Sequence, residues 1–581
     1  MTDTESSETL ISPREAGGLE DAKHDIDIEQ AKIEEAKAAL SATDIANLEH
    51  NRKHLIPIMI GLGFVIFLSA LDSTIVTTCL PVIASDLGDL SKVAWVGTSF
   101  QLTSTATMPI VSKLSDFFGR RNMLFASIAI FLVGSALCGA SVNMIMLIFF
   151  RAIQGIGAGG LMTLTFIIIS EIVSLRERGK YQGILSACLA ISLLLGPAAG
   201  GLFTDDLSWR WGFYINLVVG VIPIGLLTVY LRLPAPKGAS AEKLKRIDYL
   251  GSAVLIIACI FFLLALAWGG HEYSWDSGVI IGCFVGGVVF TAVFIYIEGR
   301  VAIDPIMPLH LFKNSNYSFN AICGFAFGFV FYGFQFCFPE YFQVGRSTSA
   351  TTSGIMGFAM VIPFILSSTI SGILITKYGR YVEFSKVGAC LSVVGLVLIS
   401  RWNLETSFGE QVGSFVVFGL GAGCTMTPQS LVAQMNAEPK EIAVATSTQN
   451  FIRTVGGVLG IAVVNTALNT AWQARLAELI TQNGLTAFSG SLFINGNFNL
   501  FAINMLPADQ KAIVISAFFY GFQICMWVAA GMTAVAEFSA MFLTHVPLRT
   551  TVGVHKTEVG GKKGAELEAT EPVLKDVTAL D

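Results

Sequence analysis

The stretch Ser112-Lys-Leu-Ser-Asp116-Phe-Phe-Gly119-Arg120 decides the fold of this chain, because a related stretch returns 260 residues later. The second copy reads Gly372-Ile-Leu-Ile-Thr376-Lys-Tyr-Gly379-Arg380 and keeps the same offset between its glycine and its arginine. Each copy follows a long apolar segment. Two halves that repeat in this way predict a pair of pseudo-symmetric helical bundles with a cavity between them.

The composition indicates that most of the surface faces hydrocarbon. Of the 581 residues, 53% are hydrophobic and only 13% are charged, whereas a soluble protein of this size carries roughly 25% charged residues. The ten cysteines include no CxxC pair and no Cys/His cluster, so we expect neither a metal site nor a disulfide framework. No basic patch interleaved with aromatic residues is present, so nucleic acid is not an expected partner.

Fourteen segments are long and apolar enough to cross a bilayer, which takes about 20 residues. The second is the weakest, because it contains Gln101 and several threonines and serines, and we expect it to pack inside a bundle. The predicted spans are 55–79, 93–112, 122–141, 144–171, 182–203, 212–231, 248–268, 278–298, 317–338, 353–375, 386–402, 412–434, 444–468 and 512–543.

This pattern predicts an all-α integral membrane protein with fourteen transmembrane helices. If the first residues lie in the cytosol, the inner loops hold 17 Lys and Arg residues and the outer loops hold 6, a bias that favours two cytoplasmic termini. The first 53 residues contain no apolar run, so no cleaved signal peptide is expected. The predicted parts are a disordered cytoplasmic tail (1–53), an amino-terminal six-helix bundle (54–233), two extra linking helices (234–300), a carboxy-terminal six-helix bundle (301–545) and a second disordered cytoplasmic tail (546–581).

Charges inside the predicted spans are the most informative residues, because each costs at least ~2.5–3.5 kcal/mol at the centre of a membrane helix. Three stand well inside, namely Asp72, Arg151 and Arg453. All seven histidines lie in tails, loops or helix ends, so any proton carrier should be a carboxylate. Burial favours the neutral form of a carboxyl group and a nearby arginine favours the charged form. We therefore predict that Asp72 carries a proton and that Arg151 is its partner; the alternative is an ion pair that only sets helix register.

The stretch that follows the second span predicts a tight cytoplasmic turn. Gly119 permits a positive φ or a close approach, and Asp116 can cap the start of a helix. Arg120 and Arg121 can hold an acidic group such as Glu171. We expect this cytoplasmic latch to join the two halves and to break when the cavity opens inward; the alternative is a positively charged turn and nothing more.

Two glycine-rich segments have different interpretations. The fifth span contains Gly183 and the run Gly196-Pro197-Ala-Ala-Gly200-Gly201. Small residues allow close helix packing and proline bends a helix, so this helix can rock; the alternative is a proline-kinked membrane helix and nothing more. The fourth span contains Gly155-Ile-Gly157-Ala-Gly-Gly160, which formally matches GxGxxG. It has no preceding strand and no βαβ unit, so a nucleotide or other cofactor is not expected.

Polar and aromatic side chains on the helices next to the predicted cavity are candidates for its substrate-binding wall. For most of them packing between helices is the alternative role. The candidates are Gln101, Gln154, Asn216, Phe331, Tyr332, Gln335, Gln449, Asn450 and Arg453.

Together these motifs resemble the major facilitator superfamily, and specifically its fourteen-span drug:proton antiporter (DHA2) branch in fungi. The resemblance covers about residues 54–545. It departs from the family pattern at Ser112 and Ser192, where glycine is usual, and at Thr376, where the first copy of the repeat has Asp116. It rests on LDSTIVTTCLP (71–81), SKLSDFFGRR (112–121), LIFFRAIQGIGAGG (147–160), GPAAGG (196–201), WRWGFYIN (209–216) and DPIMPLHLF (304–312).

The resemblance implies alternating access, with a small molecule exported as a proton enters, and it places an arginine implicated in proton coupling at Arg151. The leading interpretation is a monomeric plasma-membrane exporter of drugs, toxins or secondary metabolites. Two alternatives remain, a vacuolar or uptake carrier for basic amino acids or iron chelates, and a transport-inactive sensor or scaffold. No nucleophile–base pair supports an enzyme, and the outer segment 471–511 has no predicted role.

Overall fold

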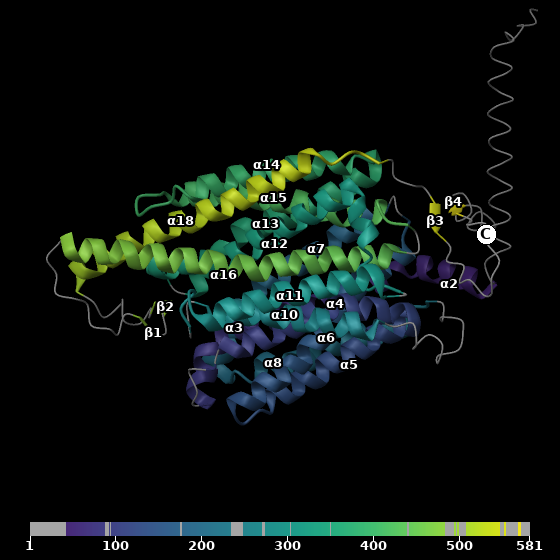
Figure 1. Cartoon of the computed structure of the whole chain (residues 1–581), viewed down its shortest axis with the longest axis horizontal. Helices are drawn as coiled ribbons and strands as arrows, with labels where there is room; N and C mark the ends of the chain where they lie inside the picture. The colour runs from purple at the N-terminus through teal and green to yellow at the C-terminus, as the bar shows by residue number, and fades with distance from the viewer. Residues whose placement is uncertain are drawn as a thin grey trace, which may run out of the picture.

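The computed structural model shows long helices whose axes run side by side along one direction (Figure 1). Among the described residues, fourteen helices have 19 residues or more. Twelve of them are long and apolar enough to cross a membrane, and the count of fourteen spans stays a prediction. The structure describes residues 42–87, 92, 94–174, 177–233, 248–269, 273–302, 304–348, 350–438, 441–482, 493–494, 497–498, 507–546, 551–553 and 568–570.

Two groups of six helices account for most of the fold. In sequence order, the first helix group consists of α3 (Leu55–Leu87), α4 (Ala94–Phe118), α5 (Arg120–Gly139), α6 (Met144–Ile172), α7 (Arg178–Leu202, continued by the π-helix η2, Phe203–Leu207) and α8 (Trp211–Tyr230). The second helix group consists of α12 (Ser315–Glu340, continued by the π-helix η4, Tyr341–Gly345), α13 (Ala350–Tyr378), α14 (Tyr381–Ile399), α15 (Phe408–Met435), α16 (Ile442–Gln482) and α18 (Ala508–Met541).

The two groups pack in the same pattern, which confirms the predicted pseudo-symmetry. Helix α3 packs on α6, α7 and α8, and α12 packs on α15, α16 and α18. The contacts of α4 with α6, and of α5 with α6 and α8, have counterparts between α13 and α15, and between α14 and both α15 and α18. Across the groups, α7 packs on α13 and α16 packs on α4. The repeat turns match too, since Gly119 (φ 90°) and Gly379 (φ 74°) both have a positive φ.

The two helices between the groups form a hairpin at the seam. Helix α10 (Tyr249–Trp268) packs on α11 (Gly278–Arg300), and α10 also contacts α4 and α16, which belong to different groups. The carboxylate of Glu298 accepts the backbone N–H groups of Ile306 (3.1 Å) and Met307 (3.3 Å). These bonds tie α11 to the segment that leads through the 3₁₀-helix η3 (Leu309–Lys313) into the second group.

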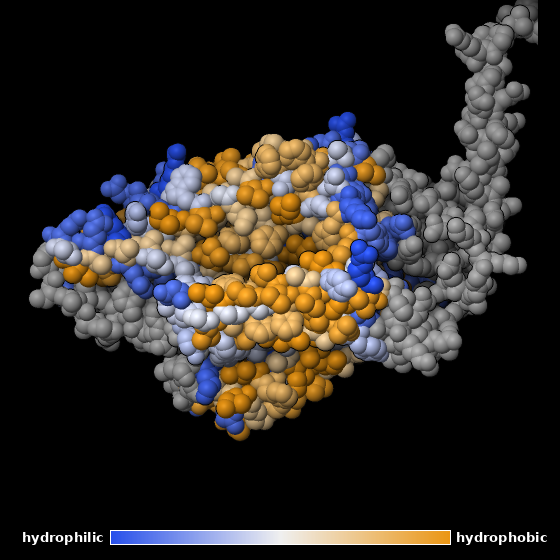
Figure 2. Space-filling view, in the orientation of Figure 1, coloured by the Kyte–Doolittle hydropathy of each residue, from blue (hydrophilic) through white to orange (hydrophobic). Residues whose placement is uncertain are grey.

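The surface is divided along the long axis of the molecule. Apolar side chains cover the middle of the helices, and polar side chains gather at both ends (Figure 2). Backbone N–H and C=O groups in hydrocarbon must be hydrogen-bonded within the protein, and a helix pairs them within its own segment. Helix α2 (Ala42–Lys53) and the strands β3 (Thr551–Gly553) and β4 (Glu568–Thr570) lie at the same end of the bundle (Figure 1), as an even number of spans requires.

Helices extend beyond the predicted spans, most of all in α3 and α16. Helix α3 continues past Pro81 to Leu87, and α16 runs to Gln482 rather than to residue 468. Residues 42–53, predicted to be disordered, form α2, because the side chain of Asn51 exchanges hydrogen bonds with the backbone of Arg232 (2.5 and 2.9 Å). Within segment 471–511 the strands β1 (Phe493–Ile494) and β2 (Asn497–Phe498) pair. The first 41 residues of the predicted tail lie outside the described residues.

Candidate functional site

The carboxylate of Asp72 is the centre of a buried polar network. Asp72 lies on α3 and is fully buried. Its Oδ2 accepts a hydrogen bond from Nη1 of Arg151 (2.5 Å) on α6. Its Oδ1 accepts from Nε2 of Gln154 (2.8 Å), also on α6, and from Nδ2 of Asn216 (2.7 Å) on α8. The predicted pairing of Asp72 with Arg151 is therefore present, and the other carboxylate oxygen has two amide donors of its own.

The guanidinium of Arg151 is held from several sides. Its Nη1 also donates to Oε1 of Gln154 (2.8 Å), and its Nε donates to the carbonyl oxygen of Val96 (3.1 Å) on α4. The guanidinium carbon lies 4.1 Å from the ring centroid of Phe100 and 5.7 Å from that of Phe213. Aromatic rings stabilise a cation in this position, so the arginine holds α3, α4, α6 and α8 in one arrangement.

A second layer of side chains connects the network to α5. Nδ2 of Asn216 also donates to Oγ of Ser135 (3.0 Å), whose hydroxyl donates to the carbonyl oxygen of Phe213 (2.8 Å). The thiol of Cys138 donates to Oε1 of Gln154 (3.6 Å). Neither Ser135 nor Cys138 was a predicted site residue. Each is one small residue in an apolar span, and no sequence signal separates them from packing residues.

The network satisfies a buried pair of opposite charges. Two buried charges are tolerated only when their attraction and their hydrogen bonds offset the loss of water, and both conditions are met here. If Asp72 took up a proton, its attraction to Arg151 would disappear and one oxygen would become a donor. The same event would loosen the contacts among the four helices that Arg151 joins.

Three residues that were predicted to line the cavity are instead enclosed among other side chains. Gln154 and Asn216 are fully buried and bonded to Asp72, so they belong to the network rather than to a cavity wall. Gln449 is also enclosed, because its Nε2 donates to the carbonyl oxygen of Asn320 (3.3 Å) and lies against Gly324. The neighbours of a side chain depend on how its helix is rotated, and the residue type does not reveal this rotation. Gln101 on α4 and Gln335 on α12 are half-buried.

The structure pairs Arg120 with Glu171, but the residues of the predicted latch do not join the two halves. Arg120 forms ion pairs with Asp116 on α4 and with Glu171 on α6 (Nε–Oε1 2.7 Å), whereas Arg121 donates to the carbonyl oxygen of Thr228 (3.0 Å) on α8. All of these residues belong to the first helix group. The expectation that they join the two halves is wrong for the contacts in this structure, because both carboxylates sit on helices of the same group as the arginines.

Other residues join the groups at the end that carries the Gly119 and Gly379 turns. Nη1 of Arg178 on α7 donates to Oε1 of Gln434 (3.3 Å) on α15, and Oγ of Ser112 donates to the carbonyl oxygen of Ala443 (3.4 Å). Gly183 of α7 lies so close to α13 that an added Cβ would be 2.6 Å from the carbonyl oxygen of Ser368. The two groups are therefore in direct contact at this end.

The glycines of the fifth-span motif predict a test of that contact. Gly183→Ala should weaken the seal between α7 and α13 by about 1–3 kcal/mol, the usual cost of overpacking, and should change the transport rate several-fold. Gly201→Ala is the matched control, since an added Cβ there meets nothing within 4 Å. Transport rates and surface abundance of both variants check this expectation, and equal rates for the two variants would contradict it.

The glycines of the fourth span serve helix packing. An added Cβ at Gly155 would lie 2.4 Å from the carbonyl oxygen of Phe100 on α4, and one at Gly157 would lie 2.5 Å from the backbone nitrogen of Phe131 on α5. Successive glycines thus let α6 approach two neighbours, which explains the GxGxxG match without a nucleotide. Close approach of α6 to α4 and α5 also brings Arg151 within reach of its partners.

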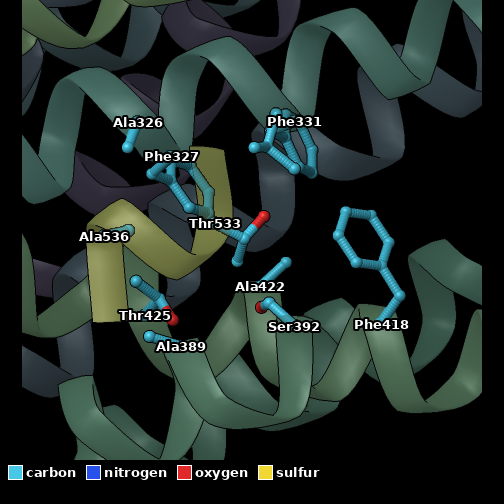
Figure 3. A pocket seen from close by; sticks show the side chains of 11 residues that line it. Ala326, Phe327, Phe331, Ala389, Ser392, Phe418, Ala422, Thr425, Thr533 and Ala536 are labelled. Carbon is cyan, nitrogen blue, oxygen red and sulfur yellow. The ribbon is translucent and has the colours of Figure 1, made fainter. Parts of the chain in front are cut away.

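A pocket in the second helix group lies among the helices that correspond to those of the Asp72 network. Those helices are α12, α14, α15 and α18, the counterparts of α3, α5, α6 and α8. Gly134 packs on Gln154 in the first group and Gly395 packs on Phe418 in the second, so Phe418 stands where Gln154 stands. Figure 3 shows the lining residues Ala326, Phe327, Phe331, Ala389, Ser392, Phe418, Ala422, Thr425, Thr533 and Ala536, with Val330 completing the set.

The lining of that pocket differs in chemistry from the Asp72 network of the first group. Its lining consists of alanine, phenylalanine and valine with the three hydroxyls of Ser392, Thr425 and Thr533 (Figure 3). No charged side chain lines it. The predicted cavity residue Phe331 thus faces the interior of the second group rather than the space between the groups. This pocket therefore contains no counterpart of the ion pair between Asp72 and Arg151.

The motif WRWGFYIN fastens the other end of the first helix group. Nε1 of Trp209 donates to Oδ2 of Asp86 (2.9 Å), and Nη1 of Arg210 donates to the carbonyl oxygens of Gly139 (2.8 Å) and Ser141 (2.6 Å). These bonds join the ends of α3, α5 and α8. They hold α8 in the register that brings Asn216 to Asp72.

Comparisons with known proteins agree with this architecture. The sequence profile of the Major Facilitator Superfamily matches residues 62–461. The MFS-type efflux pump LUC4 of a Fusarium species is 31% identical over 523 residues, which cover 88% of this chain and 92% of that protein. The efflux pump dotC of Dothistroma septosporum is 33% identical (88% and 87% covered). The multidrug transporter protein MdtP of Bacillus subtilis is 35% identical (72% and 76% covered).

A solved structure supports the fold independently. The human organic anion transporter MFSD10 superimposes with a TM-score of 0.54 at 14% sequence identity, over 83% of this chain and 99% of that one. The profile match spans more than half of the chain, and the relatives cover most of it. This chain is therefore a member of the Major Facilitator Superfamily, a membrane transporter and not an enzyme.

Proposed function

We propose that this protein is a proton-coupled exporter of small organic molecules such as drugs, toxins or secondary metabolites, and that it works by alternating access. The observation that carries the proposal is the buried carboxylate of Asp72, which shares its hydrogen bonds with Arg151, Gln154 and Asn216. In the proposed cycle, a proton from outside neutralises Asp72, the first helix group rearranges, and cargo moves outward as the proton is released inside.

The proposed proton carrier, Asp72, lies in a helix group that also forms the seam between the two groups. Arg151 connects four helices of the first group, and α4, α6 and α7 of that group also contact the second group. A change of charge at Asp72 therefore alters the packing of helices that form the seam. The direct contact between the groups near Arg178 and Gly183 would open when the cavity faces the cytosol.

Export rather than uptake is proposed from the relatives. LUC4 and dotC carry the name efflux pump, and MdtP carries the name multidrug transporter. One proton that crosses 100 mV supplies ~2.3 kcal/mol, which sustains roughly a fiftyfold concentration ratio of a neutral cargo. We further propose a monomer in the plasma membrane with both termini in the cytosol, the inner side being the one with more Lys and Arg.

The decisive experiment removes the driving force. Cells that overproduce the protein are screened against a panel of dyes and antifungal compounds, and efflux of each compound that gains resistance is followed over time. A protonophore added with ATP held constant should reduce efflux to the level of cells without the protein. Efflux that continues at the same rate after the gradients collapse would contradict proton coupling, and a tagged protein found in the vacuolar membrane would favour the vacuolar carrier.

A further inference from the structure

Arg453 is a buried cation that lacks the partner Arg151 has. It lies on α16 and is only 7% exposed. Among the described residues, no carboxylate oxygen lies within 4.0 Å of its nitrogens. Its side chain donates one hydrogen bond, from Nη2 to Oδ1 of Asn450 (2.9 Å). The other guanidinium N–H groups of Arg453 have no hydrogen-bond acceptor among the described residues.

The neighbours of Arg453 offer further donors. Because arginine has donors only, Asn450 must turn its oxygen toward Arg453, and its buried Nδ2 is left without a partner. The ring of Tyr332 on α12 packs against Gly457, one turn beyond Arg453, where an added Cβ would lie 2.5 Å from the ring. The structure gives the Tyr332 hydroxyl no hydrogen-bond partner among the residues it describes.

The location of this cluster fits a cargo site. Arg453 lies eleven residues after the start of α16 at Ile442, which is about 16 Å along the helix. The next residue, Thr454, donates to Sδ of Met108 (3.7 Å) on α4. The cluster therefore lies beside the seam between the two helix groups.

An anion is the ligand that this cluster requires. A charge in the middle of the membrane is expensive and is retained where it pairs or serves a function, and several convergent donors without acceptors bind an anion best. Asp72 is not available to pair with Arg453, because three other side chains occupy its oxygens.

We propose that Arg453, Asn450 and Tyr332 form an anion-binding subsite, and that the cargo of this transporter is an organic acid with a carboxylate, phenolate or sulfonate on an apolar body. This inference rests on the proposed export function, since it assigns the cargo of the same cavity. It argues against the carrier for basic amino acids, because an unpaired arginine repels a cation.

The test compares an acid with its neutral isostere. Full-length protein in detergent is heated with increasing 2-naphthoate or 2-naphthamide, and apparent affinities are taken from the shift in Tm. We expect naphthoate to bind about tenfold more tightly, the ratio that one charge-assisted hydrogen bond supplies. Arg453→Gln should remove the preference, Arg453→Lys should keep part of it, and Arg401→Gln, at an exposed loop position, should leave it unchanged.

A second variant covers the case in which Arg453→Gln fails to fold. Asn450→Asp places a carboxylate beside Arg453, and it should abolish the naphthoate preference while keeping or raising the Tm without ligand. Equal affinities for the two compounds in the unmodified protein, or a preference that survives both Arg453→Gln and Asn450→Asp, would overturn the proposal. Asp72→Asn should retain the preference, so loss of proton coupling and loss of anion selectivity are distinguishable.

Discussion

Asp72→Asn should abolish proton-driven efflux while the protein still reaches the membrane. Asparagine matches aspartate in shape and resembles its protonated form, which the proposed cycle itself visits, so the helices should still assemble. The side chain can no longer exchange a proton, and the concentration ratio of the cargo should fall from roughly fiftyfold, the value one proton sustains at 100 mV, to one. Efflux in cells that overproduce the variant, together with its surface abundance, measures both effects.

Asp86→Asn is the matched control for this experiment. Asp86 lies on the same helix but near its end, where it accepts a hydrogen bond from Trp209 and is more than half exposed. Asparagine keeps a side-chain oxygen that can accept the bond from Trp209, so this replacement should leave proton-driven efflux nearly unchanged. Undiminished transport by Asp72→Asn, with Asp86→Asn behaving alike, would defeat the assignment of Asp72 as the proton carrier and leave the ion pair with a structural role.

The same substitution at the two buried arginines should have different effects on stability. Arg151→Gln leaves the Asp72 carboxylate without its charged partner and removes the contacts to Val96 and Phe100, so the free energy of unfolding should fall by about 3–5 kcal/mol. Arg453→Gln removes a charge that has no carboxylate partner among the described residues, so it should not lower stability. The Tm of each variant, measured by the loss of monodisperse protein after heating, tests this contrast.

A double variant separates pairing from other contributions. Asp72→Asn/Arg151→Gln removes both charges, and it should recover part of the stability lost in Arg151→Gln because no unpaired charge remains. If Arg151→Gln alone were as stable as the unmodified protein, or if Arg453→Gln were the less stable of the two, the roles assigned to the two arginines would be reversed.

The helical framework was predictable because the bilayer imposes it. Segments of about 20 apolar residues must form helices in hydrocarbon, and the repeat around Gly119 and Gly379 indicated that the helices form two matching groups. Boundaries were less accurate where packing outside the apolar layer extends a helix, as at Gln482. Residues 42–53 form a helix that Asn51 anchors to the backbone of Arg232, just past the end of α8.

The centre of the candidate site was predictable for a similar reason. A carboxylate and an arginine inside spans must find partners, so Asp72 and Arg151 were expected to meet. Gln154 and Asn216 were assigned to a cavity wall instead, because an amide on a span gives no indication of which neighbouring helix it faces. No sequence pattern indicated that Ser135 takes part in the network.

By itself the sequence determined that this protein is a helical membrane protein of two repeated halves with a charge pair inside the first. Those features depend on local hydropathy and on the cost of charge in hydrocarbon, which operate residue by residue. Only the tertiary structure decided that Arg120 and Glu171 lie within one helix group, that Arg178 and Gly183 contact the other, and that Arg453 has no carboxylate beside it. Such contacts depend on the rotation and register of helices far apart in the chain, and those are set by the packing of whole helix faces.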